Sequence, residues 1–298
     1  ISNSVEATEE TRNFNLMVAP GYPELTSTLN QLNVNRKETA FVLVDSPLRL
    51  ASDSNTLDAW SRNLNLATDD GEDGFVSYYE YMAGYYPSGY SRDLDGNNAV
   101  VPASHMVLRS IIRSDQKSYP WFAPAGLRRG TVDNATAIGY IDGQTGEFQS
   151  IGVGNNLRDV LYNGKVNPIS VLTGSGITIY GQKTRSATTS ALDRVNVARL
   201  VVYLRRQLDL IARQYIFEPN DEITRKEIKN QIEKELNNIK VNRGLYDYAV
   251  VCDTSNNTPD RVDRNELWVD VAIEPVKAVE FVYIPVRIKN TGDIQAGL

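Results

Sequence analysis

One long amphipathic helix, predicted over residues 192–217, most constrains how this chain can fold. Its apolar residues alternate steps of four and three and form one continuous stripe. These residues are Val197, Val201, Leu204, Leu208, Ile211 and Tyr215. At 1.5 Å per residue the helix is about 40 Å long, roughly the width of a domain. We therefore expect a rigid element that spans a whole domain.

Further regular elements follow where Pro219 ends this helix, in the sequence FEPND. Asn220 or Asp221 can cap a second helix over 222–240. A strand is expected at 246–253, and two strand-like runs close the chain, at 267–275 and 278–288. A long apolar strand at a sheet edge pairs with another chain unless it is covered. An internal hairpin is the alternative for these last two runs.

The upstream part predicts alternating strands and helices, an arrangement that usually makes strands parallel. Strands are expected at 14–19, 40–45 and 75–82, with two more within 167–184. Helices are expected at 22–36, from a cap at Asp53 or Ser54 to about Leu66, and at 103–114, with a long tyrosine-rich loop over 84–98. The predicted fold class is α/β and α+β: a mixed sheet with flanking helices, then a C-terminal helix pair packed on a β-sheet with a closing hairpin. A composition change predicts an α/β core domain over 1–163 and a C-terminal α+β domain over 164–298.

Composition excludes several function classes. The net charge is 31 − 37 = −6, which argues against nucleic acid as the main partner because phosphate binding needs clustered Lys and Arg. The single cysteine, Cys252, excludes an internal disulfide, and the single histidine, His105, excludes a histidine-rich metal site. No apolar run reaches the length of a bilayer span.

Two alternative functions depend on particular residues. An α/β hydrolase would combine His105 with one of Asp45, Asp253 or Asp263, although a packed or surface histidine explains His105 better. A receptor- or carbohydrate-binding virion module would need a concave aromatic patch in the tyrosine-rich segment 78–90.

A calcium site is the third possibility that the residues raise. Asp93, Asp95 and Asn97 have the spacing with which a calcium loop begins, but its twelfth position is Ser104 instead of an acid. We therefore expect a solvated turn, no metal and no cofactor.

Several segments, taken in order, resemble the contractile tail sheath proteins of bacteriophages. They include APGYPEL, FVLVDSP, VPASHMVLRSIIRSD with PWFAPAG, NPISVLTGSGITIYGQKTR, RVNVARLVVYLRRQL, FEPND, VVCDTSNNTPDRVDRNEL and the closing pair of runs at 267–288. Each motif alone is weak, and the ordered set is specific. It covers nearly the whole chain.

The resemblance implies a structural subunit of the virion that is made in the host cytoplasm. Such subunits stack as hexameric rings around a tail tube above a baseplate, and their terminal arms add strands to neighbours' sheets. Contraction drives the tube through the host envelope, with no catalysis or cofactor. The chain begins with Ile1, so we expect a piece without the N-terminal arm and upstream domains, which by itself is monomeric.

The resemblance also suggests which residues touch the tube or neighbouring subunits. They are Arg128, Arg129, Arg199, Arg205, Arg206, Phe281 and Tyr283. For the adjacent pair Arg128 and Arg129, a solvated loop and an anchor to an acidic neighbour are equally good interpretations.

Overall fold

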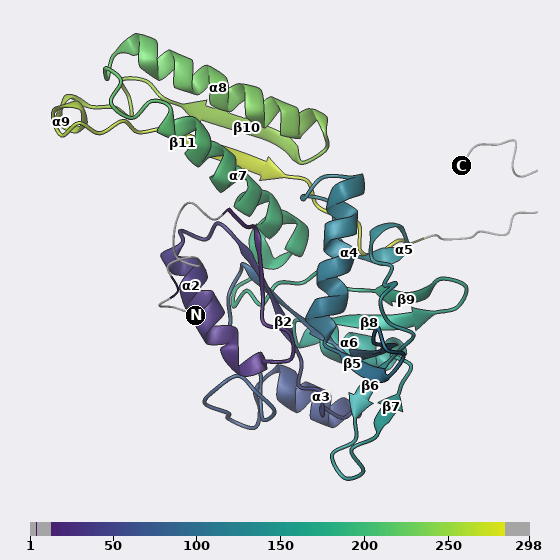
Figure 1. Cartoon of the computed structure of the whole chain (residues 1–298). Helices are drawn as coiled ribbons and strands as arrows, with labels where there is room; N and C mark the ends of the chain where they lie inside the picture. Colours follow the sequence, from purple (N-terminus) through teal and green to yellow (C-terminus); the bar gives the residue numbers. More distant parts are fainter. Residues whose placement is uncertain (1–3, 5–12, 284–298) are drawn as a thin grey trace, which may run out of the picture.

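A five-stranded sheet forms the centre of the larger part of the molecule in the computed structural model, which describes residue 4 and residues 13–283 (Figure 1). In sheet order the strands are β1 (Leu16–Val18), β2 (Phe41–Asp45), β3 (Met82–Tyr86), β8 (Val166–Leu172) and β9 (Gly176–Ile179). The first four are parallel, and β9 returns antiparallel to β8. Every residue of β2 and β3 is buried, as expected for parallel strands covered on both faces. The predicted βαβ unit is confirmed.

Helices pack around this sheet because each presents an apolar stripe. On α4, for example, Met106, Val107 and Ile111 are fully buried, and the helix contacts β2 and β3. Asp53 accepts a hydrogen bond from the Thr56 amide and caps α3, as predicted. The helices are η1 (Pro23–Leu25), α2 (Thr26–Asn35), α3 (Ser54–Ser61), α4 (Ala103–Lys117), α5 (Gly126–Arg129) and α6 (Asn155–Asn163).

A second, antiparallel sheet corrects the predicted loop over 84–98. Its strands, in order, are β5 (Asn98–Val101), β4 (Ser88–Arg92), β6 (Ala137–Ile141) and β7 (Phe148–Ser150). The glycines here indicated turns, but they permit close packing instead. A Cβ on Gly84 would lie 2.5 Å from the Phe75 ring, and one on Gly89 would lie 2.4 Å from Met106 Sδ.

The strand predicted at 75–82 is also wrong, because β3 begins only at Met82. Side chains take up the backbone groups of this segment in place of a neighbouring strand. Asp70 accepts from the amides of Val76 and Ser77, and Arg185 donates to the carbonyls of Phe75 and Ser77.

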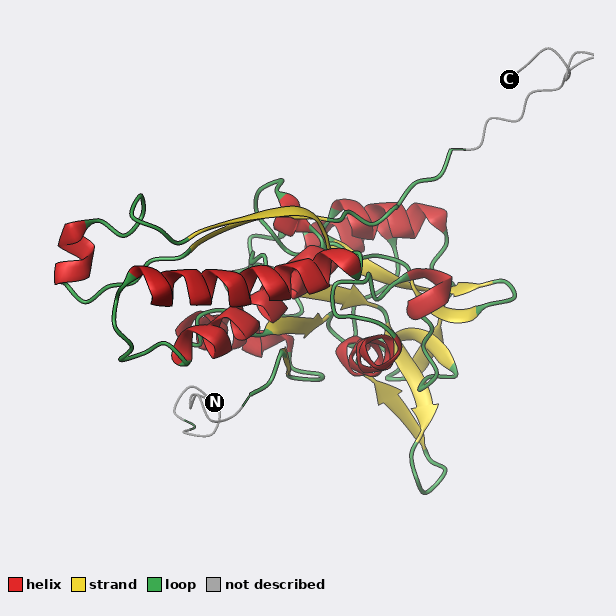
Figure 2. Cartoon of the chain, turned by 90° about the horizontal axis from the view of Figure 1, so that it is seen from above, coloured by secondary structure: helices red, strands yellow, loops and turns green. Residues whose placement is uncertain are grey.

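The smaller part consists of two long helices on a two-stranded sheet. They are α7 (Val195–Arg213), which follows η2 (Ala191–Asp193), and α8 (Glu222–Val241), with β10 (Leu245–Val251), α9 (Pro259–Asp263) and β11 (Asp270–Pro275). Figures 1 and 2 both show α8 running along the sheet, and it contacts β10. Asp221 caps α8 through the Thr224 amide, as predicted. The predicted fold class is confirmed.

The closing strand predicted at 278–288 is wrong in its described part. β11 ends at Pro275 and pairs with β10, whereas residues 276–283 have no regular secondary structure. Residues 284–288 lie outside the described residues. The domain boundary at 163/164 stays a prediction, and the five-stranded sheet takes strands from both sides of it.

Candidate assembly surface

Helix α7 joins the hydrophobic cores of the two parts. Its residues Val195, Ala198 and Val202 pack in the larger core, whereas Leu200 and Leu204 pack in the smaller one. A single continuous helix therefore carries residues of both cores.

An aromatic contact adds to this connection. Trp121, which follows α4, packs in the smaller core, and its indole N–H donates to the Asn242 carbonyl at 3.0 Å. Its ring meets the Tyr203 ring edge-on, with 5.4 Å between the centroids. The segment after α4 is thus fastened to both α7 and the end of α8.

A buried ion pair links α7 to α4. The Arg199 side chain is only 3% exposed, and its two terminal nitrogens lie 3.1 Å and 2.5 Å from the carboxylate oxygens of Asp115. An intermolecular role for Arg199 stays a prediction, and any partner would have to compete with Asp115.

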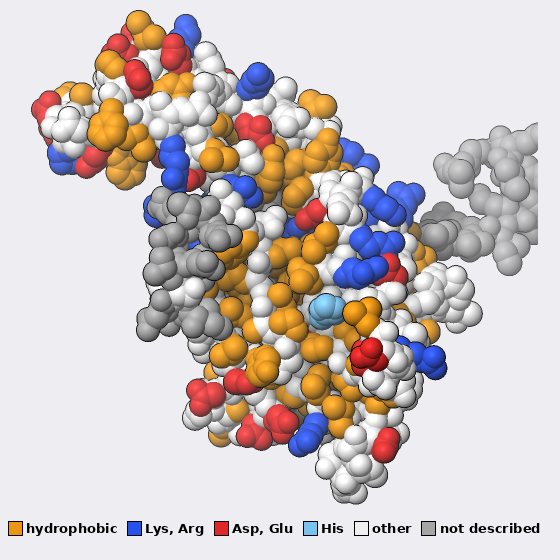
Figure 3. All heavy atoms as spheres, viewed as in Figure 1, with side chains coloured by type: hydrophobic (Ala, Val, Ile, Leu, Met, Phe, Trp, Pro, Cys, Tyr) orange, Lys and Arg blue, Asp and Glu red, His pale blue; other side chains and the backbone are white. Residues whose placement is uncertain are grey.

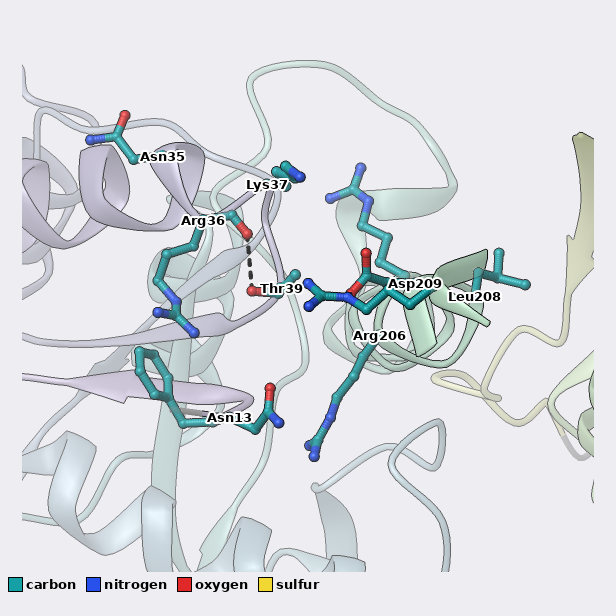
Figure 4. Close-up of a pocket in the computed structure, with 11 residues that line it drawn as sticks. Asn13, Asn35, Arg36, Lys37, Thr39, Arg206, Leu208 and Asp209 are labelled. Carbon is teal, nitrogen blue, oxygen red and sulfur yellow. Dashed lines mark hydrogen bonds and ion pairs between the residues drawn. The ribbon is translucent and has the colours of Figure 1, made fainter. Parts of the chain in front are cut away.

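Arg205 and Arg206 line a pocket between α7 and the end of α2. Arg205 donates to a carboxylate oxygen of Glu38 at 2.5 Å and lies 4.7 Å from the centre of the Tyr81 ring. Figure 4 shows Arg206 extending from α7 toward Asn13, away from Leu208. The cavity has a volume of about 470 Å³.

The adjacent pair Arg128 and Arg129 lies at the end of α5. Arg128 is exposed, whereas the Arg129 guanidinium lies 4.4 Å from the centre of the Phe122 ring. Burial, and then the charges of Arg128 and Arg243, lower the pKa of Arg129. The two interpretations of this pair, a solvated loop and an anchor to an acidic neighbour, stay predictions.

The segment after β11 crosses the surface of the larger part, and we call residues 276–283 the strap. The Val276 amide donates to the Gly244 carbonyl at 3.0 Å, and Asn196 donates to the Val276 carbonyl at 3.3 Å. Further along, Phe281 is 69% exposed and Tyr283 is 87% exposed. These two predicted interface residues are therefore accessible, and their partners stay a prediction.

Glu280 fixes the strap through an ion pair that the sequence analysis missed. Its carboxylate accepts from Arg194 Nε at 2.5 Å and Nη2 at 3.2 Å, and from Gln182 at 3.2 Å. Burial lowers the pKa of Arg194, but the bonds to Glu280 outweigh it and the net pKa is raised. The available signal was an acid inside the apolar run AVEFVYIPV.

The β10–β11 sheet is open at both edges within residues 13–283, because each strand pairs only with the other. One face packs on α8, with Tyr248 opposite Ile273 and Val250 opposite Val271. The other face is exposed and carries Asp247, Ala249, Val251, Asp270, Ala272 and Glu274. Such a sheet presents free backbone donors and acceptors to another strand.

Of the candidate catalytic residues only Asp45 and His105 lie near each other, since burial raises the pKa of Asp45 and the charge of His105 lowers it in part. His105 is exposed on α4, and Figure 3 shows the single histidine at the surface. Asp45 is buried and accepts from the Gly21 amide and from the amide and hydroxyl of Ser104, which fastens α4 to β2. Burial raises the pKa of Asp45 against these hydrogen bonds. Asp253 and Asp263 lie in the segment between β10 and β11, in the smaller part.

The remaining candidate sites have simple structural roles. Asp93 accepts from the amides of Asp95 and Asn97, as in a turn. Across the described ranges no cluster of three or more His, Cys, Asp and Glu could hold a metal ion.

None of the helices that the structure describes is long and apolar enough to cross a bilayer. Within the segment 78–90, Tyr81, Tyr85 and Tyr86 are buried and cannot belong to the predicted aromatic patch, whereas Tyr78 is exposed.

Comparison with known proteins agrees with the resemblance seen in the sequence. Residues 187–289 match the family described as phage tail sheath C-terminal domain. The tail sheath protein of Vibrio phage KVP40 is 33% identical over 220 residues, which are 74% of this chain and 30% of that protein. The tail sheath protein of Enterobacteria phage T4 is 31% identical over 216 residues, which are 72% of this chain and 31% of that protein. The chain therefore spans about a third of the length of these relatives.

Solved structures share the fold. A chain of the anti-feeding prophage baseplate in its contracted state aligns with a TM-score of 0.75 and 20% identity, covering 97% of this chain and 76% of that one. A chain of a contracted sheath complex from an extracellular contractile injection system aligns with a TM-score of 0.69 and 20% identity, covering 96% and 72%. The family match, the two phage relatives and this shared fold agree, and the chain belongs to the phage tail sheath family.

Proposed function

We propose that this chain acts as a structural subunit of a contractile tail sheath. The sheath polymerises around the tail tube and contracts to drive the tube through the host cell envelope. Its partners are other sheath subunits in hexameric rings of a helical lattice, the tail tube protein and the baseplate. It acts in the virion, without catalysis or a cofactor.

The observation that carries this proposal is the open β10–β11 sheet. Two strands covered by helix on one face make a marginal sheet, and within residues 13–283 both edges present unpaired backbone groups. An added strand from a neighbouring subunit would complete the sheet. The strap leaves the end of β11, and the Glu280 carboxylate holds it against Arg194.

Internal rigidity supports the same proposal. Contraction requires subunits that change their neighbours while keeping their own shape. The buried pair of Arg199 and Asp115 and the contact of Trp121 with Asn242 fasten the two parts together. A subunit built this way would move as one body.

Electron microscopy of the protein in its full natural length tests the proposal. We expect rings or tubes. We also expect amide exchange over 245–251 and 270–275 to slow on assembly, because added strands would protect the open edges. The buried strand β2 is the control, since its exchange should not change. Only monomers under every condition, or unchanged exchange in assembled particles, would overturn the proposal.

A further inference from the structure

The outer side of α4 and α5 carries a run of cations. Arg109, Arg113 and Lys117 follow one another at steps of four along α4, so they lie on one side of that helix. Arg128 and Arg129 extend the run onto α5, which packs against α4. Figure 3 shows Lys and Arg side chains gathered beside the single histidine. We call this surface, with one further cation at the end of α8, the basic face: Arg109, Arg113, Lys117, Arg128, Arg129 and Arg243.

Few carboxylates compensate the basic face. Asp133 is shared by two of its cations, because its carboxylate oxygens lie 2.7 Å from Arg109 Nε and 2.7 Å from Arg113 Nη1. Three exposed members have no ion pair within the described part of the chain: Lys117, Arg128 and Arg243. These three charges can therefore meet an acidic partner without breaking an existing pair.

Exposed apolar side chains lie among these cations. Ile112 precedes Arg113, Leu127 precedes Arg128, and Tyr119 follows the end of α4, and all three apolar side chains are exposed. Such a mixture of apolar and charged groups is typical of a contact with protein. The basic face therefore fits a partner that offers both carboxylates and apolar side chains.

The loop after α3 offers this combination. Its exposed side chains include two leucines and three acids: Leu64, Leu66, Asp69, Glu72 and Asp73. None of these acids has an ion pair among the described residues. Hydrogen bonds fix the backbone, because Trp60 donates to the Gly71 carbonyl at 2.9 Å and Asn65 to the Asp73 carbonyl at 2.9 Å. We call residues 64–73 the acidic loop, and its fixed backbone lowers the entropy lost on binding.

The basic face and the acidic loop lie at different ends of one copy. In Figure 1 α3, which the loop follows, lies at the bottom of the larger part. By contrast α4 ends beside the smaller part, where Trp121 packs in the smaller core. Two complementary surfaces at separate places on one chain can make a head-to-tail contact between copies. Such a contact closes into rings or continues as a helix.

We propose that the acidic loop of one copy docks on the basic face of the next, with its carboxylates facing Lys117, Arg128 and Arg243. A second copy is the partner because the acidic loop matches the basic face in charge and in its exposed apolar side chains. This inference rests on the proposed function, since it names one of the contacts by which sheath subunits associate. Because the charges are exposed, the contact weakens as salt rises.

Two charge-reversed variants of the protein in its full natural length test the contact. In the first, Lys117→Glu and Arg128→Glu make the basic face acidic. In the second, Glu72→Lys and Asp73→Lys make the acidic loop basic. Each variant alone repels its own copies, so self-association measured by sedimentation should fall about tenfold. A 1:1 mixture should recover it, because the reversed face of one variant then meets the reversed loop of the other.

The matched control carries Lys226→Glu and Lys234→Glu, two exposed cations of α8, and has the same change of charge as the first variant. It should associate like the unchanged protein. If reversal weakens association and no mixture restores it, or if the control loses association equally, the inference is wrong. Unaltered association in both variants also overturns it, while leaving the proposed sheath function in place.

A second measurement does not require assembly. A synthetic peptide of residues 62–76 should bind the chain in low salt, and the first variant should bind it about tenfold more weakly by fluorescence anisotropy. A peptide with Asp69→Asn, Glu72→Gln and Asp73→Asn is the control. Equal binding of the two peptides, or of the two proteins, overturns the inference. If the unchanged protein forms no polymer but binds the acidic peptide, the sheath function fails and the docking contact stands.

Discussion

The two sheets of this molecule differ in how far their own chain covers them. The five-stranded sheet buries every residue of β2 and β3 under helices of its own chain. The two-stranded sheet of β10 and β11 has one covered face, one exposed face and two open edges in the part that the structure describes. The difference teaches that the larger part covers both faces of its central strands with its own chain, whereas the smaller part leaves one face of its sheet exposed in the described residues.

The largest predicted loss of stability follows substitution of Arg185, which holds the larger part together. It is fully buried and donates to the carbonyls of Ser61, Phe75, Ser77 and Gly164, which come from three separate segments. Burial lowers the pKa of Arg185 to about 10, and its guanidinium stays charged at neutral pH. Arg185→Met leaves these carbonyls without donors, and we expect a loss of about 4 kcal/mol in the free energy of unfolding by urea.

The matched control for Arg185 is in the smaller part. Arg264→Met removes an exposed arginine paired with Glu266, and it should leave the unfolding midpoint unchanged. If Arg185→Met lowers the free energy of unfolding by less than about 1 kcal/mol, the hydrogen bonds of Arg185 do not hold the larger part together.

The next effect concerns the joint between the two parts. Asp115→Asn leaves the Arg199 charge buried and uncompensated, so we expect a loss of about 3 kcal/mol in unfolding free energy. Arg199→Met should cost about 1 kcal/mol, because the Asp115 side chain that remains is partly exposed and can be hydrated. Equal losses in the two variants would contradict this account, and differential scanning calorimetry measures both.

Sequence patterns predicted the longer helices because a helix is a local structure, whereas α3 ends at Ser61 instead of near Leu66 and α6 was not predicted. The apolar stripes of α4, α7 and α8 appear at regular spacing, and the caps at Asp53 and Asp221 are single residues beside their helices. The parallel strands β1 and β2 were also predictable, as two apolar runs separated by one helix.

The errors arose where distant residues decide the local structure. Gly84 and Gly89 resembled turn residues, but they make room for Phe75 and Met106. No sequence pattern singled out Arg185, because its partners lie up to 124 residues away. For the same reason periodicity could not distinguish the arginines of α7: Asp115 holds Arg199, whereas Arg206 lines the pocket between α7 and the end of α2.

A smaller effect is expected at the strap, where the predicted quantity is how often the segment opens. Glu280→Gln removes the ion pair with Arg194, and we expect the strap to open about tenfold more often, which corresponds to about 1.4 kcal/mol. Limited proteolysis within 276–283 measures this opening. Glu274→Gln, on the exposed face of β11, is the control. Unchanged cleavage after Glu280→Gln would mean that backbone bonds alone hold the strap.

The smallest predicted effect is the loss of thermal stability when a helix cap is removed, tested at one cap in each part. Asp53 caps α3 in the larger part, and Asp221 caps α8 in the smaller part. Hydrogen bonds from Thr56 lower the pKa of Asp53, and those from Thr224 lower the pKa of Asp221, both below the ordinary 3.8. Stabilisation by either cap is therefore present above pH 3.8 and is lost as the pH falls through the lowered pKa. At pH 7 we expect Asp53→Ala and Asp221→Ala each to lower Tm by about 2–4 °C.

Measuring Tm at low pH distinguishes the loss of the cap from other causes of lower stability. As the pH falls below the lowered pKa, each variant and the unchanged protein should converge in Tm, because the protonated carboxyl no longer favours the cap. A difference in Tm that persists in acid would show that the aspartate acts by some other contact. Assembly should then affect the two caps differently. A strand added to the β10–β11 sheet would also hold α8 against that sheet. The Asp221→Ala loss should shrink in assembled particles, whereas the Asp53→Ala loss should stay the same, because α3 packs where the chain already completes its own sheet.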